Sequence, residues 1–265
     1  MNKINMGNVS FDLPLGWWEL THKQKKTCLP LINLDKYDRR AAVFVAIVQS
    51  FGFIKRRQIY HNLKKLNDVQ FIELLGCLAW CEDLPREIVL LTFEHKGVKY
   101  VAPQVNMVGA ALIEYIFADA YINNIEHKGM AENLFFTLMR PIDPSIQAGD
   151  RREKFDADVC QARAESIKVE EWRLIDMLLF FVMVKKHVAT RYATIFPKAP
   201  NGKGKAVDPV QAWQSTLFSL ADGGAFGTIE QVKFASLYEV LNYLEHKQAE
   251  ADARSGWQTV PSNLQ

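Results

Sequence analysis

The sequence predicts a mainly α-helical protein with a small β component. Apolar residues recur at helical spacing over most of the chain, and only residues 9–14 and 88–103 show the patterns typical of strands. Hydrophobic residues make up 49% and charged residues 23% of the 265, which is typical of a soluble globular protein. We therefore expect a helical body with a short N-terminal strand and one β-hairpin, followed by a C-terminal helical hairpin.

The N-terminal part predicts one strand and then a series of helices. Val9, Phe11 and Leu13 alternate with polar residues, and Pro14 ends the pattern. Thr21 and Gln24 have the spacing of a capping box, which predicts a helix start, and Pro30 breaks that helix. Further helices are expected over residues 36–51, 55–67 and 67–80, with Asn67 or Asp68 as the N-cap of the last.

The middle of the chain contains the predicted β-hairpin. Residues 88–103, IVLLTFEHKGVKYVAP, are typical of two strands joined at His95-Lys96-Gly97. Helical spacing returns over residues 107–125 and 131–139, and the polar residues 151–166 fit either a loop or an exposed helix. Residues 167–196 predict the longest helix, which ends before Pro197.

Composition divides the chain into a body, residues 1–196, and a smaller C-terminal part. Residues 197–208, rich in proline, glycine and lysine, predict a flexible linker, and residues 254–265 a tail. Residues 209–253 predict a helical pair whose second helix has an apolar stripe from Ile229 to Leu244. A pair of this size is too small to be stable alone, so it must dock on its own body, on a second copy or on a partner helix. We expect it to be a docking module, with Trp213 on its first helix and Tyr238 and Tyr243 near the contact.

Charge is unevenly distributed, although the net charge is only +2. Residues 1–65 contain 12 lysines and arginines against 4 acidic residues, whereas residues 66–134 contain 4 against 10. The basic and acidic segments face each other or are simply exposed to solvent. The alternative is that the basic segment binds an acidic partner such as nucleic acid. The basic residues are Lys23, Lys25, Lys26, Arg39, Arg40, Lys55, Arg56, Arg57, Lys64 and Lys65.

The sequence lacks recognisable catalytic, cofactor and metal-binding motifs. No HExxH, GxSxG or phosphate-loop pattern is present, and NGKGK at 201–205 lacks the phosphate-loop spacing. Cys77 and Cys81 are four residues apart on a predicted helix, but no second pair completes a zinc site. We expect no enzyme activity, cofactor or metal, and buried, reduced thiols.

The expected location is the cytoplasm. The first residues contain no apolar leader, and the longest apolar run, residues 177–184, is far shorter than the roughly 20 residues that span a membrane. We therefore expect no membrane association.

Trp17 and Trp18 lie between the N-terminal strand and the first helix. Because neighbouring side chains of an extended segment point in opposite directions, one ring is expected in the core and the other at the surface. Exposed tryptophan is frequent at protein interfaces, so both are candidate partner-binding residues, together with Trp213, Tyr238 and Tyr243.

Three segments resemble a family of tail-module proteins in Mu-like prophages of Bacteroidetes-type bacteria. They are FDLPLGWWELTHKQ at residue 11, LPREIVLLTFEHKGVKYVAPQ with the following ALIEYIFADAYIN, and PVQAWQSTLFSLADGGAFGTIEQVKFASLYEVLNYLEHK at residue 209. The resemblance implies a non-enzymatic bacteriophage tail protein or tail-assembly chaperone, active in the host cytoplasm or as a virion component. It also implies partners among other tail proteins, including the tape-measure protein, and self-association. The alternative is a nucleic-acid-associated protein that uses the basic N-terminal third.

Overall fold

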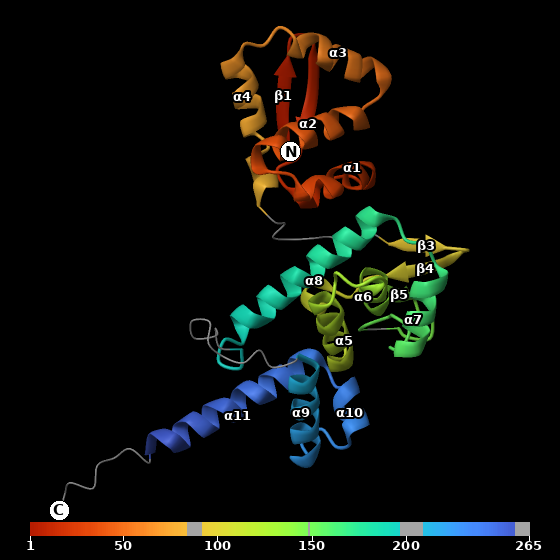
Figure 1. The fold of residues 1–265 in the computed structure, drawn as a ribbon, viewed down its shortest axis with the longest axis vertical. Helices are drawn as coiled ribbons and strands as arrows, with labels where there is room; N and C mark the ends of the chain where they lie inside the picture. Colours follow the sequence, from red (N-terminus) through yellow and green to blue (C-terminus); the bar gives the residue numbers. More distant parts are fainter. Residues whose placement is uncertain (84–91, 148, 197–208, 258–265) are drawn as a thin grey trace, which may run out of the picture. The chain divides into compact units, whose positions relative to one another are not determined.

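The computed structural model describes residues 1–83, 92–147, 149–196 and 209–257. These residues form eleven α-helices and two small antiparallel sheets, which confirms the mainly helical class with a small β component (Figure 1). The chain divides into two compact units. Unit 1 comprises Met1–Leu91 and Lys168–Met183, and unit 2 comprises Thr92–Ile167 and Val184–Gln265.

This division differs from the expected body over residues 1–196. The first unit needs Lys168–Met183, a segment distant in the sequence, and residues 209–257 belong to the same unit as the β-hairpin. Buried long-range contacts cause the difference: Lys25 Nζ lies 3.1 Å from Asp176 Oδ2, with both side chains almost fully buried. The predicted linker, residues 197–208, and residues 258–265 of the predicted tail lie outside the described residues.

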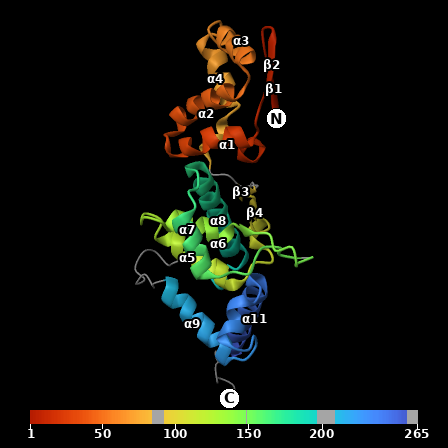
Figure 2. The same ribbon diagram turned by 90° about the vertical axis from the view of Figure 1, so that its right-hand side faces the viewer.

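Unit 1 packs helices against an N-terminal β-hairpin (Figures 1 and 2). Its elements are β1 (Asn2–Met6), β2 (Val9–Leu13), α1 (His22–Cys28), α2 (Lys36–Ser50), α3 (Phe53–Leu63), α4 (Asp68–Gly76) and the 3-10 helices Trp17–Glu19, Leu29–Asn33 and Ala79–Glu82. The sequence predicted β2 but not its partner β1, because asparagine and lysine alternate there with Ile4 and Met6. The buried Asn62 holds α3 against this hairpin by donating to the Met6 carbonyl at 3.0 Å.

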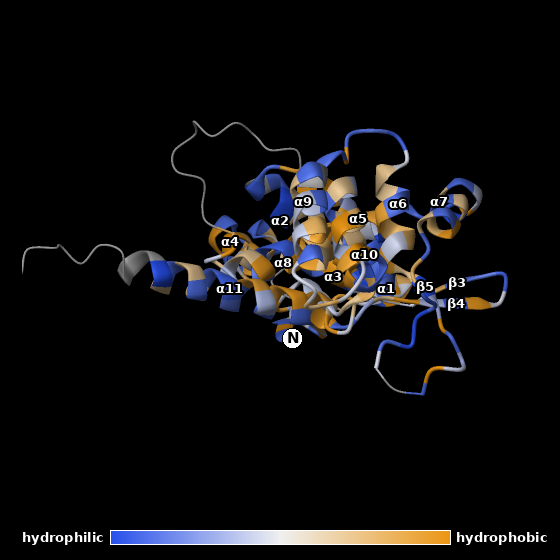
Figure 3. Cartoon of the chain, turned by 90° about the horizontal axis from the view of Figure 1, so that it is seen from below, coloured by the Kyte–Doolittle hydropathy of each residue, from blue (hydrophilic) through white to orange (hydrophobic). Residues whose placement is uncertain are grey.

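Unit 2 is built around α5 (Leu112–Asn123), which carries mostly hydrophobic residues (Figure 3). The remaining elements are β3 (Phe93–His95), β4 (Val98–Val101), β5 (Arg140–Pro141), the 3-10 helix Val105–Met107, α6 (Met130–Leu138), α7 (Ala157–Ser166), α9 (Pro209–Asp222), α10 (Ile229–Phe234) and α11 (Leu237–Trp257). α8 (Glu171–Arg191) contributes residues to both units. Helices α6, α9, α10 and α11 all contact α5. The hairpin prediction is confirmed for residues 93–101; residues 84–91 lie outside the described residues.

The C-terminal pair is three helices rather than two. The predicted second helix breaks at Ala235–Ser236, where the backbone bonds to the start of α5: Leu112 N donates to Ala235 O at 2.9 Å and Leu237 N to Ala110 O at 3.0 Å. Val232, Leu237, Val240 and Leu241 of the predicted stripe are fully buried. The stripe is therefore core of unit 2, and the expectation of a separate docking module is replaced by a helical layer on α5.

Candidate protein-binding surfaces

Helix α3 carries a basic and aromatic outer surface in unit 1. Ile59 is fully buried and holds the helix to the core, whereas Phe53 and Ile54 are 66% and 73% exposed. Residues spaced three or four apart share one face of a helix. A shallow groove of about 370 Å³ follows this face and is lined by Phe53, Arg56, Arg57, Tyr60, His61 and Lys64.

The cations of α3 differ from the other predicted basic residues in their partners. In unit 1, Lys25 pairs with Asp176, Lys26 with Glu170 and Arg40 with Glu82. Arg39 donates to the carbonyls of Cys81 and Glu82, each at 3.1 Å. Within the described residues, no carboxylate forms an ion pair with Lys55, Arg56, Arg57, Lys64 or Lys65. The basic surface is therefore much smaller than the ten residues predicted and centres on α3.

Helix α4 exposes most of its apolar side chains. Val69 and Ile72, one turn apart, are 65% and 67% exposed, and Phe71 is 39% exposed. Leu74 is the helix's only buried residue. Of the two predicted N-caps, Asn67 or Asp68, the structure has Asn67, which forms a capping box and accepts from Gln70 N at 2.9 Å. Val69 and Ile72 share one face of the helix, and exposed apolar side chains that gather on a surface mark interaction sites.

The sequence contains a signal for this exposed surface. The segment DVQFIELLG has apolar residues on more than one side of a nine-residue helix, so a single buried face cannot cover them all. Phe53 and Ile54 likewise precede Ile59 and Asn62, the two buried residues of α3.

The structure places Trp17 in the core and Trp18 at the surface. The Trp17 ring packs edge-to-face on Trp80 at 5.2 Å, and its Nε1 donates to the Asp83 carbonyl at 3.0 Å. The Trp18 ring is 45% exposed. The two rings separate as expected but for a different reason, because the segment is a 3-10 helix rather than extended chain.

Unit 2 contains an apolar groove of about 500 Å³ between α5, α7, α9 and α10. Its floor is formed by Ile113, Ile116, Phe117, Phe155, Trp213, Leu217 and Phe234, and its rim by Asp156, Ala157, Asp158, Gln214, Glu230 and Lys233. Lys233 pairs with Glu230 at 2.5 Å, and Asp156 caps α7 by accepting from Val159 N at 3.1 Å. Asp158 has no cation partner within the described ranges. The rim is therefore acidic around an apolar floor.

The three C-terminal candidate residues all contact their own unit. Trp213 is buried against Tyr115, with its Nε1 3.4 Å from Asp119 Oδ2. Tyr238 donates to the Asn106 carbonyl at 2.7 Å, and Tyr243 packs on Phe226. Trp213 also forms part of the floor of the apolar groove, so it is the one of the three that lines a candidate binding surface.

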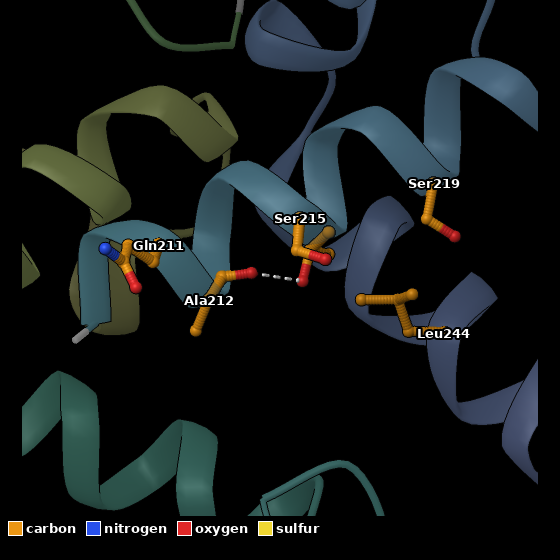
Figure 4. A pocket seen from close by; sticks show the side chains of 6 residues that line it. Gln211, Ala212, Ser215, Ser219 and Leu244 are labelled. Atoms are coloured by element: carbon orange, nitrogen blue, oxygen red, sulfur yellow. Dashed lines mark hydrogen bonds between the residues drawn. The ribbon is translucent and has the colours of Figure 1, made fainter. Parts of the chain in front are cut away.

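A second hollow of unit 2 lies between α9 and α11 (Figure 4). It is lined by Gln211, Ala212, Ser215, Thr216, Ser219 and Leu244. Thr216 donates its hydroxyl back to the Ala212 carbonyl at 3.0 Å within α9. The lining is neutral, and Leu244 is its one large apolar side chain, so the hollow provides no charged group for a ligand.

Three buried charges of unit 2, Glu114, Arg140 and Arg152, form a network with the partly exposed Asp150. Glu114 Oε2 lies 2.7 Å from Arg140 and 2.8 Å from Arg152, and Arg152 also binds Asp150 at 2.5 Å. Arg152 donates further to the Leu138 carbonyl at 2.8 Å, and Glu114 accepts from Ala111 N at the start of α5. The pKa of Asp150 is held below its usual value by hydrogen bonding and charge attraction from Arg152, which outweigh burial. The network compensates its own charges and links α5 to β5, so its role is structural.

The cysteines do not combine into a reactive or metal-binding site. Cys77 follows α4 and is partly exposed, whereas Cys81 is buried in the next 3-10 helix, so the two do not lie on one helix and Cys77 is not buried as expected. Burial raises the pKa of Cys28 to about 12 and that of Cys81 to about 11. Within the described residues, no group of three or more potential ligands is arranged to hold a metal ion. The same residues contain no helix with the length and hydropathy of a membrane span.

Comparison with protein-family models, with curated proteins and with solved structures finds no significant match to this chain. Functional inference therefore depends on the surfaces described above and on the sequence resemblance.

Proposed function

We propose that this chain is a non-enzymatic protein that acts by binding other proteins, as a bacteriophage or prophage tail protein or tail-assembly factor. The observation that carries the binding role is α4, which exposes Val69, Phe71 and Ile72 to solvent. Full burial of an exposed side chain of this size contributes roughly 1.5–3 kcal/mol. Covering the exposed part of each of these three side chains contributes a fraction of that and favours association. The tail setting, and a cytoplasmic or virion location, are supported by the sequence resemblance alone.

The test is capture of a tape-measure protein from a Mu-like prophage tail module of the kind that the sequence resembles. The double substitution Val69→Lys and Ile72→Lys should weaken capture at least about tenfold, since central apolar contacts dominate interface energies. Val98→Lys is the matched control, because Val98 is also an exposed valine, on β4 of the other unit. Equal capture by the α4 variant and the control would refute a binding role for α4. No capture by any form, wild type included, would count against the tape-measure partner.

Nucleic-acid binding by α3 is the second candidate function. It is favoured by the cations without an acidic partner and by Tyr60 and Phe53 beside them. A protein that contacts Z phosphates loses affinity with a log–log salt slope of about −0.9 Z, and α3 provides at most about five such contacts. We expect no sub-micromolar, salt-sensitive shift of DNA or RNA in a gel at physiological salt. A shift that weakens steeply with added salt would favour this candidate over the first.

A further inference from the structure

We propose, on the basis of the protein-binding role above, that the apolar groove of unit 2 binds helix α3 of a second copy of this chain. The groove has an apolar floor that includes Trp213 and Leu217, and an acidic rim that includes Asp156 and Asp158. A volume of about 500 Å³ lies in the range of pockets that enclose clusters of apolar groups. The groove therefore requires an occupant with apolar side chains at its centre and basic side chains around them.

Helix α3 has this combination of groups. Phe53 and Ile54 are its exposed apolar anchors, and Arg56 and Arg57 follow in the next turn. Arg56 lies over the Phe53 ring at 5.8 Å, so the cation and the anchor are presented together. Each anchor therefore has an arginine three residues later on its own side of the helix, Arg56 after Phe53 and Arg57 after Ile54. A helix that places apolar anchors in a groove is a common mode of recognition.

The charges of the two surfaces are complementary. The rim contains Asp156, Asp158 and Glu230, and its one cation, Lys233, pairs with Glu230. Lys154 lies beside the groove with its Nζ 4.2 Å from the centre of the Phe234 ring, so a net negative charge of one remains around the groove. Helix α3 and the two lysines after it contain no acidic residue. Complementary potentials of this kind fix the partner and the register of an interface.

The contact joins different surfaces of two identical chains and is therefore heterologous. Each copy then keeps one unused α3 and one unused groove, so association either closes into a ring or continues into an open chain. We expect sedimentation velocity to show mass that rises with concentration up to the order of 100 µM. Raising the salt from about 0.05 M to 0.5 M should reduce this mass, because screening weakens the charge contacts.

Two variants, each altered on one surface, test the contact. The α3 variant carries Phe53→Ser and Ile54→Ser, which remove the apolar anchors and keep the cations, and the groove variant carries Asp158→Lys and Glu230→Lys, which leaves the Asp156 cap of α7 intact. Each variant alone should be monomeric. An equimolar mixture should form a 1:1 dimer that does not grow, because one intact groove meets one intact α3, whereas the altered groove and the altered α3 are both basic and repel. The control variant, Val98→Ser with Val105→Ser, alters two exposed apolar residues that line neither surface and should associate like the wild type.

The outcomes separate this contact from the proposed function. A wild-type chain that stays monomeric at low salt, association that survives both variants, or a mixture that fails to dimerise would each overturn the contact. If such a chain still captured a tail protein through α4, the protein-binding role would stand and only the self-association would be refuted.

Discussion

At the residue scale, Gly16 and Trp18 depend on each other. A Cβ atom at position 16 would lie 2.2 Å from the Trp18 ring, so the ring covers the glycine and only a residue without a side chain fits beneath it. Gly16→Ala should displace the Trp18 ring into solvent, at small cost because that ring is already half exposed. The expected result is a red shift and stronger quenching of tryptophan fluorescence. Unchanged fluorescence would show that the ring does not rest on Gly16.

Glu170 is a carboxylate whose titration the structure alters. The hydrogen bond from Lys26, 2.5 Å away, lowers its pKa from the usual 4.5 to about 2, with further bonds from Trp172 and Arg173. Since the folded-state pKa is depressed, the stabilisation is present above about 4.5 and is lost as pH falls through 4.5 toward 2. The pair is exposed to solvent, so its contribution to stability is small.

Lys26→Met tests this assignment. The side-chain carbonyl resonance of Glu170, followed by NMR, should titrate at a clearly higher pH in the variant than in the wild type. Lys36→Met, which removes an exposed lysine from the start of α2, is the control and should leave the titration unchanged. An unaltered pKa in Lys26→Met would mean that Trp172 and Arg173 set it instead.

Local residue chemistry was predictable from the sequence where it involved near neighbours. The capping box of Thr21 and Gln24 and the cap at Asn67 were predicted and are formed, because their partners lie three residues away. The internal pairing of Lys25 and Arg40 was not predictable, since their partners Asp176 and Glu82 are distant in the sequence.

At the element scale, α4 shows how a short helix can hold an exposed apolar surface. Isolated helices of this length are unstable, so its N-terminal cap matters more than it would in a long helix. The Asn67 side chain accepts from Gln70 N, and the Gln70 side chain accepts from Asn67 N at 3.1 Å. The cap keeps α4 ordered although only Leu74 is buried.

Asn67→Ala should destabilise α4 by about 1 kcal/mol. Amide hydrogen exchange of α4 should accelerate roughly fivefold, and capture of the tail partner should weaken with it. Asn33→Ala, which removes an exposed asparagine outside the α4 cap, is the control and should leave both measurements unchanged. Unaltered exchange in Asn67→Ala would show that tertiary contacts alone order α4.

Element types were more predictable than element boundaries. Periodicity indicated α2, α3, α6 and α8 correctly, but it merged α10 and α11 into one helix. The break at Ala235–Ser236 is imposed by backbone bonds to Ala110 and Leu112, and no local breaker residue marks it in the sequence.

At the scale of the whole molecule, the assignment of segments to units was the least predictable feature. Hydrophobic periodicity identifies the face that each helix buries, but it does not identify the partner that covers the face. The apolar stripe of α10 and α11 requires a surface that covers it, and α5 of the same chain provides that surface. The groove residues Asp158 and Glu230 come together from α7 and α10 only through this packing.

The final prediction follows from the buried stripe. Val232, Leu237, Val240 and Leu241 are fully buried, and removing residues 209–265 would expose their contacts on α5. The truncated chain should therefore lose the cooperative melting of unit 2 and bind a hydrophobic dye, because α5 cannot leave its apolar surface uncovered in water. Leu241→Ala is the milder form and should cost about 2–5 kcal/mol, whereas Leu34→Ala, at a position 38% exposed, should cost under about 1 kcal/mol. A truncated chain with native near-UV circular dichroism and no dye binding would show that the C-terminal helices are a separable module after all.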